Sequence, residues 1–596
     1  MLNFFASAFT SSSRPLLATS VLAALVLTAC SDNTATEGSS DTGTTGTPPE
    51  TTTTVTTDLA TTTTTTTTGD IVLLCEPGAQ RCADTTTREV CKPTGLQWEP
   101  ASCGNYQTCT EQGNEEATIA TCVGPCEKAE TSPTSVGCEF LAIRVRSGNG
   151  EEDLEEFYDA LLVGNPDDKT ASVQLYFTPN LSYLEAPLGE PVILKTGEST
   201  IFKLTNSTIS GFSAIRAGGI YRVKSDIPVI AYLHSPLKNT DSNDSSMLLP
   251  IKSLRQDYVV ASYPALVDPN KPDLYRGRPS FFNVIALENK TTISWTPPKI
   301  SAGNGLNLPK VLADETGTVE LNRFDLMQIG ASTQNADGTP NTDYKLHDIS
   351  GTVIHADKPI WVLSGTACAN VPFESPGYCN HLQEQMIPIE YWGTKYVGAH
   401  SPLRADEMHY WRVYAGADDV YVTFDPQNVH PPFKMFRRGD FIDMQVPNGV
   451  SFTFKGTGPF MPVQYLASSK SAGGNGDPAM YQTIPIEQYL KRYVFVTGIA
   501  YEKNYAQLVR VDGSAPILLN GVEVPEDKFY LVNSIGLRYR VYDMPLDPGD
   551  EPKFYVAESA DPFSLSVIGY VGIPGSGRGS AYAYPGGMAL NSLNIP

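Results

Sequence analysis

The sequence has little positive charge: 42 lysines and arginines stand against 65 aspartates and glutamates, for a formal net charge of −23 over 596 residues. Nucleic acids and anionic lipid surfaces both attract basic faces, so this balance argues against either as a partner. Long charged helical patterns are also missing, while glycine, proline, threonine and tyrosine are plentiful. That composition favours an all-β protein. The length predicts about three to five domains rather than one core.

The sequence also lacks a recognisable catalytic or metal motif. Its seven histidines are scattered, and no His-Glu-x-x-His occurs. The stretch Gly575 to Gly579 has neither the Gly-x-Ser-x-Gly spacing of a nucleophile elbow nor the Gly-Lys-Ser/Thr ending of a phosphate loop. Carboxylate pairs for glycoside hydrolysis stay open because their spacing is spatial, but no pair stands out. We therefore predict that the chain is not an enzyme and needs no cofactor or metal.

The acidic stretch around Asp241, Asn243 and Asp244 is the nearest approach to a calcium loop. An EF-hand needs glycine at its sixth position and glutamate at its twelfth. Counting from Asp241, these positions hold Ser246 and Lys252, so the pattern fails. A different oxygen-ligand calcium site is the alternative to the polar turn that we expect here.

The N-terminus carries one apolar run, from Leu16 to Leu27. It is too short to span a bilayer comfortably and suits a signal peptide. The run ends in Leu-Thr-Ala29-Cys30, which resembles a bacterial lipobox. The resemblance implies cleavage between Ala29 and Cys30 and acyl chains, such as palmitate, attached at Cys30. Several acyl chains anchor a protein stably. We therefore expect a lipoprotein signal peptide at 1–29 and an anchor in the outer membrane or cell surface of a Gram-negative bacterium, the alternative being an ordinary signal peptide.

Two segments follow that cannot form a large core. Residues 30–70 consist mostly of Thr, Ser, Gly and Pro, so we expect a disordered tether. Residues 71–138 hold eight cysteines and few large apolar residues, which predicts a module stapled by disulfides. Zinc is the rival, but it usually needs Cys-x-x-Cys pairs or nearby histidines, which are missing. The eight cysteines, whose connectivity stays open, are Cys75, Cys82, Cys91, Cys103, Cys109, Cys122, Cys126 and Cys138.

One short signature recurs three times in the rest of the chain. Each copy has a proline between apolar residues and, eight residues after the proline, a tyrosine followed by valine. A second signature places an aspartate one or two residues before a proline, where we expect a turn and the start of a strand. The first signature is Leu249-Pro250-Ile251 with Tyr258-Val259, Ile387-Pro388-Ile389 with Tyr396-Val397, and Ile484-Pro485-Ile486 with Tyr493-Val494. The second is Asp226-Ile227-Pro228, Asp357-Lys358-Pro359 and Asp561-Pro562, with a looser copy from Gly458 to Val463.

The repeats predict four domain-sized β modules. Each begins with a strand, a turn and a returning strand that together look like a hairpin, as in Phe157 to Val163 and Ala171 to Phe177. Repeats of about 100 to 130 residues are longer than propeller blades. We predict an all-β fold of tandem β-sandwich-like modules, with a large-bladed, propeller-like closed array as the alternative. The predicted modules are 139–250, 251–388, 389–485 and 486–596, the last including a C-terminal tail.

Six stretches of these modules are similar to a known family: Gly219 to Tyr232, Ser242 to Pro250, Asp257 to Ser262, Gly365 to Pro372, Cys379 to Pro388 and Trp392 to Val397. Together they resemble the IgGFc-binding protein N-terminal domain family over about residues 136 to 590, here in a bacterial lipoprotein setting. The resemblance implies a secreted, all-β recognition or adhesion domain. The animal member is implicated in binding IgG Fc, whereas bacterial members generally have no assigned ligand. Bacterial members often have aspartate directly before the histidine of the stretch from Cys379 to Pro388, where this chain has Asn380 before His381.

Two loops that differ between the modules are the candidate sites. Cys368 and Cys379 bracket a loop rich in proline and glycine, which predicts a disulfide between them in preference to a Cys379–His381 nucleophile. The ligand-loop candidates are Asp241, Asn243, Asp244 and His381. We expect a monomeric surface lipoprotein that binds a protein or glycan partner. A structural envelope scaffold is the alternative, and a secreted hydrolase is a more distant one.

Overall fold

The computed structural model describes residues 73–114, 117–147, 158–209, 211–237, 242–265, 280–373, 379–532, 536–549, 551–573 and 578–594. Several predictions made from the sequence lie outside these residues. They concern the signal peptide, Ala29 and Cys30, the tether, Asp241, and residues 575–577 of the glycine-rich stretch. No helix among the described residues is long and apolar enough to cross a membrane.

The cysteine-rich region forms two small sheets and one short helix. β1 (Gln80–Cys82), β2 (Thr87–Cys91) and β3 (Trp98–Ser102) make a three-stranded sheet, and β4 (Thr108–Asn114) pairs with β5 (Ala117–Val123). Helix α1 (Pro125–Thr131) follows. The prediction of disulfides instead of zinc is confirmed, and the pairs are Cys75–Cys91, Cys82–Cys109, Cys103–Cys122 and Cys126–Cys138. These crosslinks staple a segment that has almost no buried apolar core of its own.

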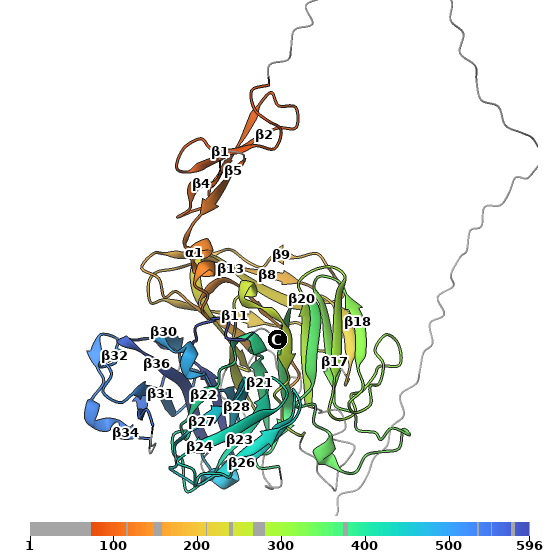
Figure 1. The fold of residues 1–596 in the computed structure, drawn as a ribbon, viewed down its shortest axis with the longest axis vertical. Coiled ribbons are helices and arrows are strands. Elements are labelled where there is room, and N and C mark those ends of the chain that lie inside the picture. The colour runs from red at the N-terminus through yellow and green to blue at the C-terminus, as the bar shows by residue number, and fades with distance from the viewer. Residues whose placement is uncertain are drawn as a thin grey trace, which may run out of the picture. The chain divides into compact units, whose positions relative to one another are not determined.

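Four β modules follow, numbered 1 to 4 along the chain and coloured from orange to blue in Figure 1. Module 1 has β6 (Gly137–Ala142), β7 (Asp159–Gly164), β8 (Ala171–Thr178), β9 (Ala186–Pro187), β10 (Val192–Leu194), β11 (Ser199–Leu204), β13 (Ile220–Ser235) and β14 (Asp244–Met247). Module 2 has η1 (Ile251–Ser253), β15 (Arg255–Val259), β16 (Ser280–Ala286), β17 (Thr291–Thr296), β18 (Gly317–Leu321), β19 (Asp325–Gly330), η2 (Tyr344–Leu346), β20 (Val353–Ala369) and β21 (Asn380–Gln385). Strand β12 (Ala214–Ala217) precedes β13 in the chain but pairs with β19 of module 2.

Modules 3 and 4 repeat this order. Module 3 has η3 (Ile389–Tyr391), β22 (Lys395–Gly398), β23 (His409–Ala415), β24 (Val420–Asp425), β25 (Phe433–Met435), β26 (Phe441–Val446), β27 (Phe452–Gly456), β28 (Phe460–Tyr465), η4 (Ser469–Ala472) and β29 (Met480–Gln482). Module 4 has η5 (Ile486–Gln488), β30 (Leu490–Val496), β31 (Lys503–Val511), β32 (Leu518–Leu519), β33 (Val522–Glu523), η6 (Glu526–Lys528), β34 (Tyr530–Leu531), β35 (Tyr539–Leu546), β36 (Phe554–Ile573) and β37 (Arg578–Pro585). The predicted all-β fold of tandem sandwich-like modules is confirmed.

Each module is organised by one long strand that serves two sheets. In module 2 the first part of β20 pairs with β15 and β17, and its second part pairs with β16 and β21. Strands β13 and β36 do the same in modules 1 and 4, while module 3 divides this strand into β27 and β28. The two consecutive strands at the start of each module therefore join different halves of the sandwich. The prediction that they form a hairpin was wrong, because each of them pairs with the long strand.

The aspartate–proline signature lies inside the long strand and not at its start. The register shifts at this point in β13, β20 and β36, as expected for a proline that has no N–H to give to the ladder. Asp226, Asp357 and Asp561 each accept a hydrogen bond from a backbone N–H of the neighbouring segment, at 2.8, 2.8 and 2.9 Å. In module 3 the Thr457 hydroxyl accepts the equivalent bond from the N–H of Tyr421. The signature therefore marks the bulge where a strand passes from one sheet to the other.

The tyrosine of the first signature fastens the edge strand of its module to this bulge. The Tyr258 hydroxyl accepts a hydrogen bond from the N–H three residues earlier and donates one to the Ile360 carbonyl, directly after the proline. Tyr396 and Tyr493 make the same two contacts in modules 3 and 4. Phe140 has the same register position in module 1, without the hydroxyl. The repeated tyrosine is therefore a structural residue.

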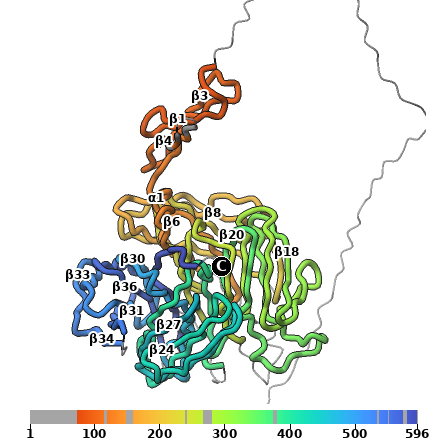
Figure 2. Tube along the Cα trace, in the orientation of Figure 1, coloured from red at the N-terminus to blue at the C-terminus, as the bar shows by residue number. Residues whose placement is uncertain are grey.

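The last strands of the four modules meet at a common centre. β14 and β29 each pack against both β21 and β37, so the four strands form a closed circuit. In the tube view of Figure 2 the four differently coloured modules occupy separate sectors of the body. Residues after β37 then return to the start of module 1, where Ser135 N–H donates to the Met588 carbonyl and Leu590 N–H donates to the Pro133 carbonyl, both at 2.9 Å. We call this contact the seam.

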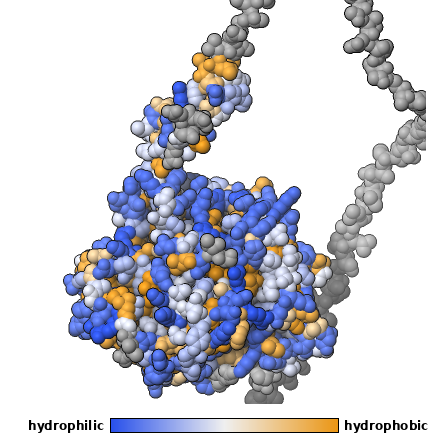
Figure 3. All heavy atoms as spheres, in the orientation of Figure 1, coloured by the Kyte–Doolittle hydropathy of each residue, from blue (hydrophilic) through white to orange (hydrophobic). Residues whose placement is uncertain are grey.

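Most buried apolar side chains form one large cluster that extends from Phe140 in module 1 to Leu590 beyond module 4, and two smaller clusters lie beside it. The four modules therefore share one hydrophobic core and are not independent domains joined by linkers. The face shown in Figure 3 is mostly hydrophilic, with scattered apolar patches. Such a division keeps the apolar surface inside and leaves the exterior free to carry polar binding sites.

Candidate functional site

The predicted ligand loop lies in the centre of the protein. Asn243, Asp244 and His381 are 1, 0 and 0% exposed, and Asp241 is outside the described residues. An external ligand cannot reach these three side chains in this structure, so the prediction that they belong to a ligand-binding loop was wrong. Most of their polar groups bond to other parts of the chain, which allows a polar stretch to be buried, while His381 Nε2 has no hydrogen-bond partner among the described residues.

The Asp244 carboxylate joins all four modules. Its Oδ1 accepts a hydrogen bond from the N–H of Ser245 at 2.8 Å. Its Oδ2 accepts from the N–H groups of Gln383 at 3.2 Å and Met480 at 3.1 Å, and the N–H of Ala583 also donates to this carboxylate. These donors lie on β14, β21, β29 and β37, one from each module. One buried side chain therefore ties together the four central strands.

Other titratable groups surround Asp244 in the centre. Burial raises the pKa of Asp244 well above its usual value, against the effect of its backbone donors. Burial and then the Asp244 charge raise the pKa of Glu384 well above its usual value. Burial lowers the pKa of His234 to about 3 and that of His381 to about 4. No group of three or more His, Cys, Asp or Glu residues in the described part of the chain is arranged to hold a metal ion.

The second predicted loop is closed by a disulfide between Cys368 and Cys379. Because Cys379 carries no free thiol, the structure does not offer the Cys379–His381 nucleophile. His381 instead points its Nδ1 to the Thr366 carbonyl at 3.1 Å. The disulfide ties the end of β20 to the start of β21, and Pro372 and Phe373 lie between the two cysteines.

The modules differ most usefully at the residue that directly follows the three-residue proline signature, which we call the signature position. In each copy the signature forms a 3₁₀ turn, and the turn of one module packs against the edge strand of the module before it. Glu390 of η3 pairs with Arg255 at 2.6 Å, and Glu487 of η5 accepts hydrogen bonds from Thr394. The corresponding residue of η1 is Lys252, whose ammonium group makes no ion pair or hydrogen bond with any described residue.

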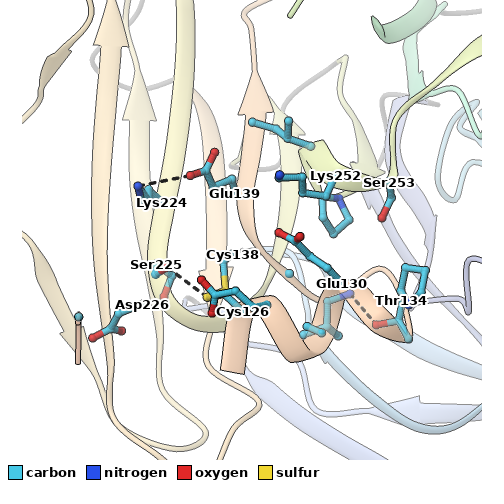
Figure 4. A pocket seen from close by; sticks show the side chains of 18 of the residues that line it. Cys126, Glu130, Thr134, Cys138, Glu139, Lys224, Ser225, Asp226, Lys252 and Ser253 are labelled. Atoms are coloured by element: carbon cyan, nitrogen blue, oxygen red, sulfur yellow. Dashed lines mark hydrogen bonds and ion pairs between the residues drawn. A yellow bond between two sulfur atoms is a disulfide. The ribbon is translucent and has the colours of Figure 1, made fainter. Parts of the chain in front are cut away.

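Lys252 lies beside a cavity of about 650 Å³, shown in Figure 4, which we call the α1 groove. It is lined by α1, β6, β13, η1 and the loop around Asn105. The Cys126–Cys138 disulfide fixes α1 to β6. Strand β6 pairs with β13 and with no other described strand, so one of its edges is left without a strand partner. An unpaired edge beside a groove is the arrangement that proteins use to bind an extended segment of a partner.

The charges in the α1 groove are mixed and partly unpaired. Glu130 on α1 and Lys252 on η1 face the groove from opposite sides in Figure 4, and neither makes an ion pair with a described residue. Lys224 on β13 pairs with Glu139 on β6 at 3.5 Å. Both Glu130 and Lys252 are exposed, so their charges are available to a ligand that carries groups of both signs.

Our sequence reasoning missed this groove. The one signal that pointed to it is visible in the repeats, where lysine stands in the first copy and glutamate in the other two. The contribution of α1 could not be read in the same way, because a seven-residue helix leaves almost no periodic pattern.

Comparison with known proteins places the central modules in a family. The model of the family described as IgGFc binding protein matches residues 244–569, which is more than half of the chain. The human IgGFc-binding protein is 25% identical over 273 residues, which are 46% of this chain and 4% of that protein. This chain thus spans only a small part of the length of that relative. No solved structure matches the chain.

Proposed function

The chain belongs to the IgGFc-binding protein family, and from this membership we propose that it is a surface recognition protein that binds a protein partner through the α1 groove. A glycan partner is the alternative of the same class. The observation that carries the proposal is the unpaired charge of Lys252. The residues at the same position in the other two copies, Glu390 and Glu487, bond to the preceding module, whereas Lys252 bonds to no described residue. It stands opposite Glu130 beside an unpaired strand edge. Main-chain bonding along β6 would supply affinity, and the two charges would select the partner.

The full-length chain provides the test. The printed name of the human relative suggests purified IgG Fc as the first probe, followed by partners captured from cell-surface extract and then purified and titrated. We expect a saturable partner whose Kd rises at least about tenfold with Lys252→Glu, since this change reverses a charge at the interface. Lys395→Glu makes the same change on an exposed residue of β22 outside the groove and serves as the control.

Two results would count against this assignment. A saturable partner that binds the Lys252→Glu and Glu130→Lys chains as tightly as the original would remove the groove from the proposal. Failure to find any saturable partner would favour the alternative, a structural scaffold of the envelope, which predicts an envelope defect when the chain is deleted.

We further propose that the protein is exported and anchored by lipid on Cys30, as a monomer. The support is the match of residues 27–30 to a lipobox and the threonine-rich segment that follows. Cys30→Ala should move the protein from the membrane to the soluble fraction and abolish labelling by a radioactive fatty acid. Continued acyl labelling of the Cys30→Ala chain would contradict the anchor.

We propose no enzymatic role. In the described part of the chain, the central carboxylates and histidines line neither the α1 groove nor two further cavities, of about 340 and 670 Å³. A group that no substrate can touch cannot act as a general acid, a general base or a nucleophile. Hydrolysis of captured glycans or peptides during the binding tests would overturn this view.

A further inference from the structure

The tip of the cysteine-rich region carries three exposed leucines. Leu73, Leu74 and Leu96 are 54, 69 and 46% exposed, and Figure 3 shows apolar surface at this end of the region. Leu73 and Leu74 are the first two described residues, and Leu96 lies in the turn between β2 and β3. We call these three residues the leucine tip. Exposed apolar side chains that gather at one place often mark a site of interaction.

The backbone brings the three leucines together. The N–H groups of Leu74 and Cys75 donate to the Gly95 carbonyl at 2.8 and 3.2 Å, so the chain lies across the β2–β3 turn. Leu73 fills the space above this turn, because a Cβ added to Gly95 would meet Leu73 Cδ2 at 2.5 Å. The Cys75–Cys91 disulfide then fixes the crossing to the end of β2. The leucine tip is therefore held in place by hydrogen bonds and a crosslink.

The leucine tip carries no charge of its own. The turn residues from Pro93 to Leu96 are all uncharged. Lys92, directly before them, has its Nζ 4.0 Å from Glu99 Oε1, so its charge is partly balanced. The first charged residue after Leu74 is Glu76. A surface of this kind suits an apolar environment and has no charge with which to select an acidic or a basic partner.

The leucine tip is too small to hold a protein partner by itself. The three leucines together expose less surface than two whole leucine residues would. A stable protein interface buries about 800 Å² on each partner. A surface to which the chain is already tethered needs much less contact, because a tether keeps the two surfaces at a high effective concentration.

The position of the leucine tip in the chain identifies such a surface. The threonine-rich segment that begins at Cys30 ends three residues before Leu73. A flexible segment of this length has a mean reach of roughly 35 Å. A bilayer that holds acyl chains on Cys30 would therefore stay within reach of the leucine tip at all times.

We propose that the leucine tip inserts into the headgroup region of the phospholipid bilayer that holds the acyl chains of Cys30. The proposal rests on the proposed lipid anchor and adds to it a second, weaker membrane contact. The leucines would enter the boundary between head groups and acyl chains, where binding grows with the apolar area that is buried. The contact would fix which end of the cysteine-rich region faces the bilayer, so the folded protein would not turn freely on its tether.

Trp98 supplies the probe for the experiment. It lies two residues after Leu96 and is partly exposed. The other four tryptophans are buried, and they are Trp295, Trp361, Trp392 and Trp411. Bromine atoms on the acyl chains of a lipid quench the fluorescence of a tryptophan that reaches the bilayer. In vesicles of brominated phosphatidylcholine, the acylated full-length chain should therefore lose the emission that Trp98 contributes, relative to vesicles of plain phosphatidylcholine.

Two variants show whether the leucines cause this loss. The double variant Leu74→Ser with Leu96→Ser should keep its emission in brominated vesicles, because the apolar area that enters the bilayer is removed. Leu306→Ser makes the same change at an exposed leucine of module 2 and is the matched control. Its emission should fall as far as that of the original chain. All three chains should float with the vesicles, since each keeps Cys30.

Flotation and quenching separate the anchor from the leucine tip. Quenching that the double variant alone loses, while all three chains float, would support the proposal. An original chain that floats without quenching, or equal quenching in the double variant, would overturn the tip and leave the anchor standing. A chain that neither floats nor incorporates fatty acid would contradict the anchor and the tip together. Self-association that the double variant loses, without any quenching by lipid, would also overturn the proposal and point to a second copy of the chain.

Discussion

Replacing Asp244 by asparagine tests the role of the central carboxylate with almost no change in shape. A carboxylate accepts hydrogen bonds at both oxygens, whereas an amide has one oxygen and one NH₂ group. The donors of Ser245 and of Gln383 and Met480 lie on opposite oxygens. Whichever way the asparagine is turned, its NH₂ group therefore faces at least one backbone N–H, and one buried donor loses its partner.

The expected cost follows from that count. A buried donor without a partner costs about 1–3 kcal/mol. If the amide nitrogen takes the place of Oδ2, both Gln383 and Met480 lose their acceptor, so the asparagine should adopt the other orientation. We expect a loss of about 2–4 kcal/mol in unfolding free energy, because the remaining mismatch also pushes two donors together. The four N–H groups that Asp244 accepts lower its pKa against the larger effect of burial, and a charge on Asp244 raises the pKa of Glu384.

Denaturant unfolding of the full-length chain at pH 7, followed by tryptophan fluorescence, gives the measurement. Four of the five tryptophans lie in modules 2 and 3, so the signal reports on modules that the Asp244 side chain joins to module 1. Asp357→Asn is the matched control, because that exposed carboxylate accepts one bond from Thr292 and its loss should cost under about 1 kcal/mol. A change below about 0.5 kcal/mol for Asp244→Asn would refute the reasoning. It would mean that Asp244 is already protonated in the folded protein.

Two further predictions concern buried polar groups. Glu384→Gln should remove a pH dependence: since the folded-state pKa of Glu384 is raised, its contribution to stability is present below the unfolded pKa and is lost as the pH rises. The unfolding midpoint of the variant should therefore equal that of the original chain near pH 4 and exceed it at pH 8. Unfolding midpoints that fall in parallel for both chains as the pH rises would contradict this prediction. Tyr396→Phe should cost about 2 kcal/mol in unfolding free energy, because the Gly393 N–H and the Phe460 carbonyl lose their partner, while Tyr421→Phe on an exposed tyrosine should cost almost nothing. Equal melting curves for these two tyrosine variants would show that the Tyr396 hydroxyl does not fasten the edge strand.

The all-β class and the repeats could be predicted because they depend on local patterns. Prolines and tyrosines at fixed spacing mark the same 3₁₀ turn and edge strand in each copy. The pairing of the strands could not be read in this way. Strand β8 follows β7 after a short turn, and only the bent β13 shows that the two strands belong to different halves of the sandwich. A bend of this kind depends on contacts with the rest of the module.

The candidate site was misplaced for a related reason. The stretch from Ser242 to Ser246 is polar, and polar stretches are usually exposed. Here it is buried, because β21, β29 and β37 bring donors and acceptors from more than 130 residues away. No local window contains those partners. The residues that carry the resemblance to the family, around Asp244 and His381, therefore describe how the modules are held together.

The position of the seam has a consequence for any partner of the α1 groove. The hydrogen bond from the Met588 N–H to the Ser135 hydroxyl joins residues 453 positions apart, so the seam closes the ring that the four modules form. Pro133 and Thr134, which belong to the seam, also line the α1 groove. A partner that binds only when the seam is closed would stabilise the closed ring of modules, because its binding free energy adds to the stability of the state that it binds. A partner in the α1 groove would thus raise the free energy needed to separate modules that it does not contact.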